Sequence, residues 1–295
     1  MENKSFSYSI DMVRLKVMQY VDDQKINGLD ILGVSSVMEQ LKYNSNVTYR
    51  HMTRFDAYRH NFSFKDYNAF GEECGFWVGI EHNSLAKDSG AYAKVDVTLE
   101  YNPNKCLGSP LLEFVVNSFF KDNCKVEVKS FDLAIDLPFN ITCIKPVLKG
   151  NRSYRPQFYG GDNQTHYIGS RGSDGAIKIY NKARESGLKG VQLTRYEITI
   201  KPNVTIDNMV GLYGVNPGMF IGLNVVDMFQ FDFKLSGTDK VLLLACMEHP
   251  EYLKELSRDK HKKIKQLLAE NCSISFDYLL INKTINDFFK NIYTL

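Results

Sequence analysis

The stretch that decides the fold is AIKIYNK, residues 176–182. Side chains of a β-strand alternate between two faces, so Ile177 and Ile179 can enter a core while Lys178, Tyr180 and Lys182 share the opposite, open face. A phenol flanked by two ammonium groups suits binding of a phosphodiester or attack on one, because the cations favour both the phenolate and the approaching anion. The alternative is an exposed strand whose lysines serve solubility.

A second strand, residues 130–137, carries two carboxylates. Asp132 and Asp136 fall on one face, about 13 Å apart at roughly 3.3 Å per residue. Hard carboxylate oxygens suit Mg²⁺ or Mn²⁺, which predicts a divalent cation here. At that separation both aspartates reach one ion only if the strand bends. Each aspartate could instead cap a turn or pair with a lysine.

A third strand, residues 192–201, places Arg195, Glu197 and Lys201 on one face. Glu197 is a possible partner for the aspartates across a sheet, and a cross-strand ion pair with a lysine is the alternative. Residues 166–171 and the turn 172–175 lead into the Tyr180 strand as a hairpin, which could present Arg171 to an anion.

The remaining segments predict an α+β fold in which a curved, mainly antiparallel sheet has helices on its outer face and a helical region follows at the C-terminus. Strand alternation occurs at residues 10–17, 62–67, 74–80 and 91–101, and helical spacing at 30–41 and 111–120. Residues 144–165 are polar and predict an exposed loop, while the chain from residue 204 onward predicts mainly helix. We therefore expect a catalytic domain over residues 1–203, with halves 1–100 and 101–203, and a helical domain over 204–295.

The strongest basic run lies in the helix expected at residues 252–270. Such a run is usually a solvated helix face, but a basic helix also lets a protein of low net charge hold a DNA backbone. Its cationic side chains are Arg258, Lys260, Lys262, Lys263 and Lys265.

Composition excludes several classes of protein. The net charge of +2 is too small for a globally basic nucleic-acid binder, so any basic surface has to be local. Six cysteines without a Cys-x-x-Cys pair, and no signal peptide ahead of them, favour a reduced, cytoplasmic protein. The longest apolar run, residues 241–247, is far short of the roughly 20 residues of a membrane span. Phosphate-loop, paired-cysteine zinc and His-Glu-x-x-His motifs are absent from the sequence.

An ordered set of motifs resembles the rolling-circle replication initiators of small plasmids and integrative conjugative elements. The motifs are YNPNK at 101–105, FDLAID at 131–136, YIGSRGSD at 167–174 followed by IKIYNK at 177–182, and RYEITIK at 195–201. The resemblance covers roughly residues 95–201, with a weaker likeness over 260–268, and residues 1–90 match poorly. Lys178 stands where an arginine is usual, and this change removes a bidentate phosphate contact.

The resemblance implies a nuclease that cuts one DNA strand at an origin. It identifies Tyr180 as the nucleophile, and Tyr167 as an aromatic that is not the nucleophile. It also makes Asp132, Asp136 and Glu197 the metal-site carboxylates, some of which would hold Mg²⁺ or Mn²⁺. Lys178, Lys182 and Arg171 would assist at the phosphate. DNA would be held by Arg195, Lys201 and the basic C-terminal helix, which matches the region by which these initiators select their own origin.

Further expectations concern partners and alternatives. The products would be a 5′-phosphotyrosine and a 3′-OH primer, and the partners would be a second copy of the chain and a host helicase. A conjugative relaxase has the same chemistry, whereas a catalytically silent origin-binding protein would bind DNA without cutting it. A tyrosine recombinase fits less well, because the helical Arg plus His-x-x-Arg set is missing.

Overall fold

A computed structural model describes residues 6–21, 31–51, 58–83, 93–120, 125–148, 152–226, 235–270 and 274–292. The chain divides into two compact units. The Tyr180 unit comprises Met1–Ser9, Leu133–Ile200 and Gly214–Asn282, and the Trp77 unit comprises Ile10–Asp132, Lys201–Tyr213 and Lys283–Leu295. Each unit combines stretches that are distant in sequence, so neither matches the linear segments 1–203 and 204–295. The assignment of nicking and origin recognition to those segments stays a prediction.

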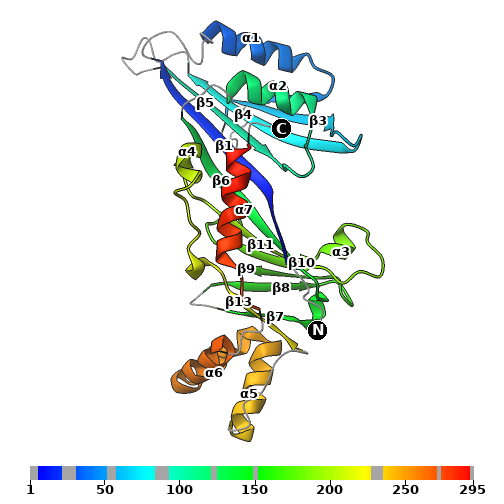
Figure 1. The fold of residues 1–295 in the computed structure, drawn as a ribbon, viewed down its shortest axis with the longest axis vertical. Coiled ribbons are helices and arrows are strands. Elements are labelled where there is room, and N and C mark those ends of the chain that lie inside the picture. Colours follow the sequence, from blue (N-terminus) through cyan, green and yellow to red (C-terminus); the bar gives the residue numbers. More distant parts are fainter. Residues whose placement is uncertain are drawn as a thin grey trace. The chain divides into compact units, whose positions relative to one another are not determined.

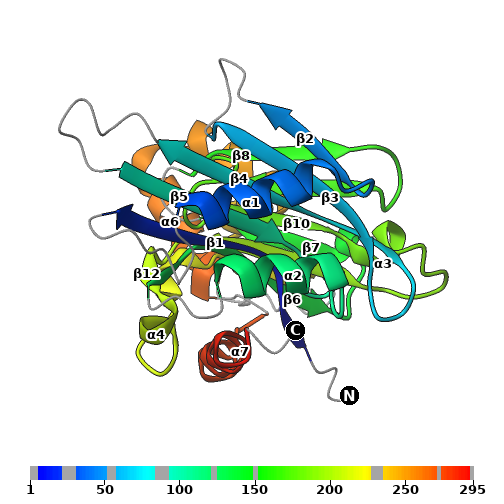
Figure 2. The same cartoon turned by 90° about the horizontal axis from the view of Figure 1, so that it is seen from above.

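The Trp77 unit is built on an antiparallel meander. Its strands follow the order β2 (Val47–His51), β3 (His60–Tyr67), β4 (Glu73–Asn83), β5 (Ala93–Tyr101) and β1 (Ser7–Val21). Only the part of β1 from Ile10 onward belongs to this unit. Helices α1 (Ile31–Lys42) and α2 (Pro110–Phe119) lie on the same side of these strands (Figures 1 and 2). Short elements β12 (Val204–Thr205), which pairs with β6, and α4 (Ile206–Met209) complete it.

The alternation of side chains between the two faces of each strand explains the core of this meander. Phe62, Val78 and Leu99, from three neighbouring strands, are fully buried, as is Leu112 on the inner face of α2. Helix α2 begins where the sequence provides a cap, because the Ser109 hydroxyl accepts a hydrogen bond from the backbone N–H of Leu112 at 3.2 Å.

The Tyr180 unit contains a sheet with the order β6 (Val126–Leu137), β11 (Thr194–Ile200), β10 (Ile177–Asn181), β9 (Gln164–Ile168) and β8 (Tyr154–Phe158). Only the part of β6 from Leu133 onward belongs to this unit. Ile177 and Ile179 are buried, as the alternation of the 176–182 stretch predicts. The four-residue helix α3 (Lys182–Glu185) directly follows β10 (Figure 1).

The same unit holds a second, two-stranded sheet and most of the C-terminal helices. Strand β7 (Ile144–Val147) pairs with β13 (Gly222–Val225), and α5 (Gly237–Glu248), the 3₁₀ helix η5 (Pro250–Glu255) and α6 (Arg258–Glu270) pack nearby. Val147, Leu243, Ile264 and Leu268 share one apolar cluster. The 3₁₀ turns η2 (Ile141–Cys143) and η3 (Pro217–Met219) belong here, and α7 (Tyr278–Lys290) starts in this unit.

The predicted fold class is confirmed: the protein is α+β, with mainly antiparallel pairing and a largely helical C-terminal part. Two local predictions are wrong. Residues 144–165, expected as an exposed loop, contain β7 and β8, and residues 222–225 form a strand within a region expected to be helical. These strands have only four or five residues, and so short a segment shows too little alternation to be recognised from sequence.

Candidate functional site

Strand register gathers the candidate residues on one face of the Tyr180 unit. In the β10–β11 pair, Tyr180 lies opposite Arg195 and Lys178 lies opposite Glu197. Directly opposed residues of antiparallel strands share a face, so these four side chains belong to one polar cluster. On the other side of β10, Lys178 is opposite Tyr167.

The Tyr180 side chain is held by its two charged neighbours. Its hydroxyl donates a hydrogen bond to Glu197 Oε2 at 3.2 Å, and Lys178 Nζ lies 4.0 Å from the centroid of its ring. Only 7% of the residue is exposed, so the expectation of a tyrosine on an open face is wrong. A phenol, a proton-accepting carboxylate and a cation therefore meet at one point.

Arg195 and Asp136 form a bidentate ion pair beside this group. Arg195 Nε lies 2.6 Å from Asp136 Oδ1 and Arg195 Nη2 lies 2.7 Å from Asp136 Oδ2. The two side chains are 9% and 17% exposed, which makes this a largely buried pair. Arg195 is thus bound inside the unit, and its predicted contact with DNA has no support in this geometry. Both oxygens of Asp136 are likewise engaged by the guanidinium.

The predicted metal ligands are not gathered into one group. Glu197 accepts the Tyr180 hydrogen bond, Asp136 binds Arg195, and Asp132 belongs to the Trp77 unit. Over the residues that the structure describes, no three His, Cys, Asp or Glu side chains are arranged to hold a metal ion. The binding of a divalent cation therefore stays a prediction. The three carboxylates predicted to bind it are not arranged to do so in this structure.

The predicted phosphate-facing cations differ in their surroundings. Lys182 pairs with Glu185 one turn along α3 and is 17% exposed. Arg171 lies in the exposed turn between β9 and β10. Lys201 is exposed and belongs to the Trp77 unit.

The cationic side chains of helix α6 are of two kinds: some bind a carboxylate of α5, and others face solvent. Lys260 Nζ and Lys263 Nζ lie 2.9 Å and 2.6 Å from the two carboxylate oxygens of Asp239, whose side chain on α5 is 4% exposed. These contacts and the Ser236 hydroxyl hold the pKa of Asp239 well below its usual range. Arg258 and Lys262 are exposed, and Lys265 is partly exposed. Part of the predicted basic surface therefore fastens α6 to α5.

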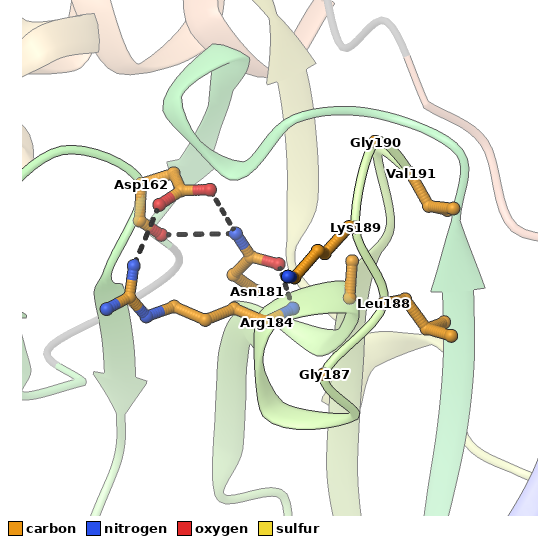
Figure 3. A pocket seen from close by; sticks show the side chains of 9 residues that line it. Asp162, Asn181, Arg184, Gly187, Leu188, Lys189, Gly190 and Val191 are labelled. Atoms are coloured by element: carbon orange, nitrogen blue, oxygen red, sulfur yellow. Dashed lines mark hydrogen bonds and ion pairs between the residues drawn. The ribbon is translucent and has the colours of Figure 1, made fainter.

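Two polar groups near the site were not anticipated from the sequence. Asn181, at the end of β10, donates to the Asp162 carboxylate at 2.8 Å and accepts from the backbone N–H of Arg184 at 2.9 Å (Figure 3). An asparagine just before a helix is the usual signal for such a cap. His166 is buried on the opposite face of β9, where the Tyr154 hydroxyl lies 2.8 Å from its Nδ1. Burial lowers the pKa of His166 to about 4, and no sequence signal marked it.

Along the parts of the chain that the structure describes, none of the helices has both the length and the apolar character to cross a membrane.

Comparison with known proteins finds only weak likeness, and this is to solved structures. No family model matches the chain, and no curated protein matches it. Among solved structures, a rolling circle replication initiator protein from Geobacillus stearothermophilus is similar at 16% identity and a TM-score of 0.38. The alignment covers 67% of this chain and 75% of that one.

Proposed function

We propose that this protein nicks and rejoins one DNA strand through Tyr180, and that it thereby initiates rolling-circle replication. The observation that carries the proposal is the environment of the Tyr180 hydroxyl. Glu197 accepts its hydrogen bond at 3.2 Å and Lys178 lies 4.0 Å from its ring centroid. A weak nucleophile of this kind needs a base to take its proton and a positive charge to favour the phenolate, and both are present.

The reaction balances with these groups alone. The Tyr180 oxygen attacks the phosphorus of a phosphodiester while Glu197 accepts the phenol proton. The bond between phosphorus and the 3′ oxygen breaks, and that oxygen receives the proton by way of solvent. The products are a 5′-phosphotyrosine and a free 3′-OH, which can prime synthesis. Attack of a 3′-OH on the phosphotyrosine reverses the reaction and rejoins the strand without ATP.

The cations of this site would neutralise charge on the phosphoryl oxygens. Lys178 is already beside the ring, Arg171 comes from an exposed turn, and Lys182 would exchange its Glu185 partner for a phosphate.

The proposed substrate is a single-stranded segment of an origin, because the tyrosine has to reach a phosphate that duplex pairing does not hold in place. The exposed cations Arg258 and Lys262 of α6 would hold adjacent DNA through its phosphates. A second copy of the chain and a host helicase are the proposed partners, and the cytoplasm is the proposed location. A conjugative relaxase would use the same chemistry at a transfer origin.

One observation favours a second candidate, a catalytically silent DNA-binding protein. The Tyr180 residue is only 7% exposed, as expected for a tyrosine whose hydrogen bond stabilises the sheet rather than one that meets a substrate.

Cleavage of DNA separates the two candidates. The purified protein would be incubated with a supercoiled plasmid library and Mn²⁺ or Mg²⁺, and nicked DNA bound covalently to protein would be sought on denaturing gels. We expect a covalent adduct with the native chain and none with Tyr180→Phe. Tyr167→Phe is the matched control, because Tyr167 lies on the adjacent strand opposite Lys178. DNA binding without cleavage under either metal would support the silent protein.

A further inference from the structure

A pocket of about 300 Å³ lies directly after the Tyr180 strand. The wall on one side is Asp162, from the β8–β9 connection, together with Asn181 and Arg184. The other side is the loop 187–191, which links α3 to β11 (Figure 3). Its volume is at the lower end of the range for ligand sites, which fits a group about the size of one nucleotide.

The loop that forms the pocket is held at both ends. The Gly187 N–H donates to Arg184 C=O at 3.1 Å and the Leu188 N–H donates to Ala183 C=O at 2.7 Å. This is the paired bonding that ends a helix at a left-handed residue, and Gly187 has φ +68°. At the other end, the backbone N–H groups of Lys182 and Ala183 both donate to Leu193 C=O, at 2.9 and 3.2 Å. These bonds preform the pocket.

The lining combines positive charge with an apolar wall. Two cations, Arg184 and Lys189, face one anion, Asp162, which already binds Arg184 at 3.3 Å. No hydrogen bond or ion pair to Lys189 occurs among the described residues, and its side chain points from the loop toward the pocket (Figure 3). Leu188 and Val191 are about half exposed, at 49% and 50%. A phosphate with an attached base matches this lining, since the phosphate suits the cations and the base suits the apolar wall.

We propose that this pocket binds one nucleotide of the single strand that Tyr180 cuts. The inference rests on the proposed function, since it assigns a subsite of the same substrate. Asn181 follows Tyr180 directly in the chain, and consecutive Cα atoms are only about 3.8 Å apart. Successive side chains of a strand point to opposite faces, so Asn181 and the pocket lie across the end of β10 from the Tyr180 hydroxyl. A DNA single strand that passes around the end of β10 can reach both. The phosphate of the bound nucleotide contacts Arg184 and Lys189, and its base packs against Leu188.

The test measures binding alone. All variants carry Tyr180→Phe, so the probe, a fluorescein-labelled mixed-sequence single-stranded 20-mer, is not cut. Fluorescence anisotropy gives the dissociation constant as a function of NaCl concentration. Arg184→Ala/Lys189→Ala removes two phosphate contacts and should weaken binding at least tenfold. It should also reduce the slope of log K against log salt by about 1.4, because each contact with a single strand contributes about 0.7.

Two further variants separate the pocket from general effects. Lys254→Ala/Lys290→Ala removes the same charge from two exposed sites outside the pocket and should leave the dissociation constant within about twofold. Leu188→Ala removes part of the apolar wall and should weaken binding about fivefold with an unchanged salt slope. Thermal unfolding checks that each variant is folded.

The inference is overturned if the pocket variant binds like the Lys254/Lys290 control, or if the Tyr180→Phe parent does not bind the 20-mer at all. Failure of the proposed function has a different signature, since the native chain then forms no covalent adduct whatever the binding results.

Discussion

The ion pair between Asp136 and Arg195 gives a prediction whose magnitude can be worked from the structure. Replacing Asp136 with Asn keeps the shape of the side chain and removes the charge that faces a 9% exposed guanidinium. Removing one partner of a buried pair costs roughly 3–5 kcal/mol, because the other charge stays buried without compensation. The pair is partly exposed, so we expect a loss of about 2–4 kcal/mol in the free energy of unfolding.

The assay is urea and thermal unfolding followed by far-UV circular dichroism. Tryptophan fluorescence is unsuitable because the only tryptophan, Trp77, lies in the other unit. For a chain of this size, about 3 kcal/mol lowers the unfolding midpoint by roughly 6–12 °C. The matched control is Glu100→Gln, which breaks the more exposed Arg14–Glu100 pair and should cost less than about 1 kcal/mol.

Equal, small losses for Asp136→Asn and Glu100→Gln would refute the reasoning. They would mean that the Asp136–Arg195 pair does not anchor the sheet, and Asp136 would again be open to the predicted role of metal ligand.

Three other predictions concern pH, helix packing and the pocket loop. His166 has a pKa lowered to about 4 by burial, whereas the unfolded chain has the ordinary value of 6.5. The contribution of neutral His166 to the free energy of unfolding is therefore complete above about pH 6.5. It is lost as the pH falls toward 4, a change of up to about 3 kcal/mol. The pH dependence of the urea midpoint should become shallower over this range in His166→Phe, and an unchanged dependence would contradict the assignment. Lys263→Met removes a contact with Asp239 and should speed amide hydrogen exchange in α5 and α6 at least tenfold. The control Lys262→Met, at an exposed position, should leave the exchange rates unchanged. Equal effects of the two variants would refute the contact. Gly187→Ala places a Cβ at φ +68° and should cost about 1 kcal/mol in urea unfolding, while no measurable loss would show that the loop adopts another conformation.

Alternation in the sequence predicts the strands that carry the site, because each has one buried face. Ile177 and Ile179 enter the core as predicted. Strand β6 contains the segment expected at 130–137, and β11 lies within the segment expected at 192–201. Local periodicity says which residues share a face. It does not say how strands pair, so the sequence places Glu197 beside the aspartates or a lysine and does not predict its contact with Tyr180.

The parts that the sequence did not predict depend on partners distant in the chain. Arg195 reads as a surface cation in isolation and is buried only because Asp136, 59 positions earlier, neutralises it. Lys260 and Lys263 read as members of a DNA-binding run, yet Asp239 binds both. Tyr180 is likewise buried, with Lys178 of its own strand over its ring and Glu197 of the neighbouring strand at its hydroxyl. Charge patterning alone cannot distinguish a cation that meets DNA from one that meets a buried carboxylate.

The most direct test of the central claim is to identify the residue that bears DNA. After reaction with the plasmid library, nuclease and trypsin digestion should leave a nucleotide on the tetrapeptide of residues 179–182, which contains Tyr180 as its only tyrosine. The account predicts this modified peptide by mass spectrometry, and predicts its loss in Tyr180→Phe. A nucleotide on the peptide that contains Tyr167, or a nicked plasmid with no modified tyrosine, would contradict it.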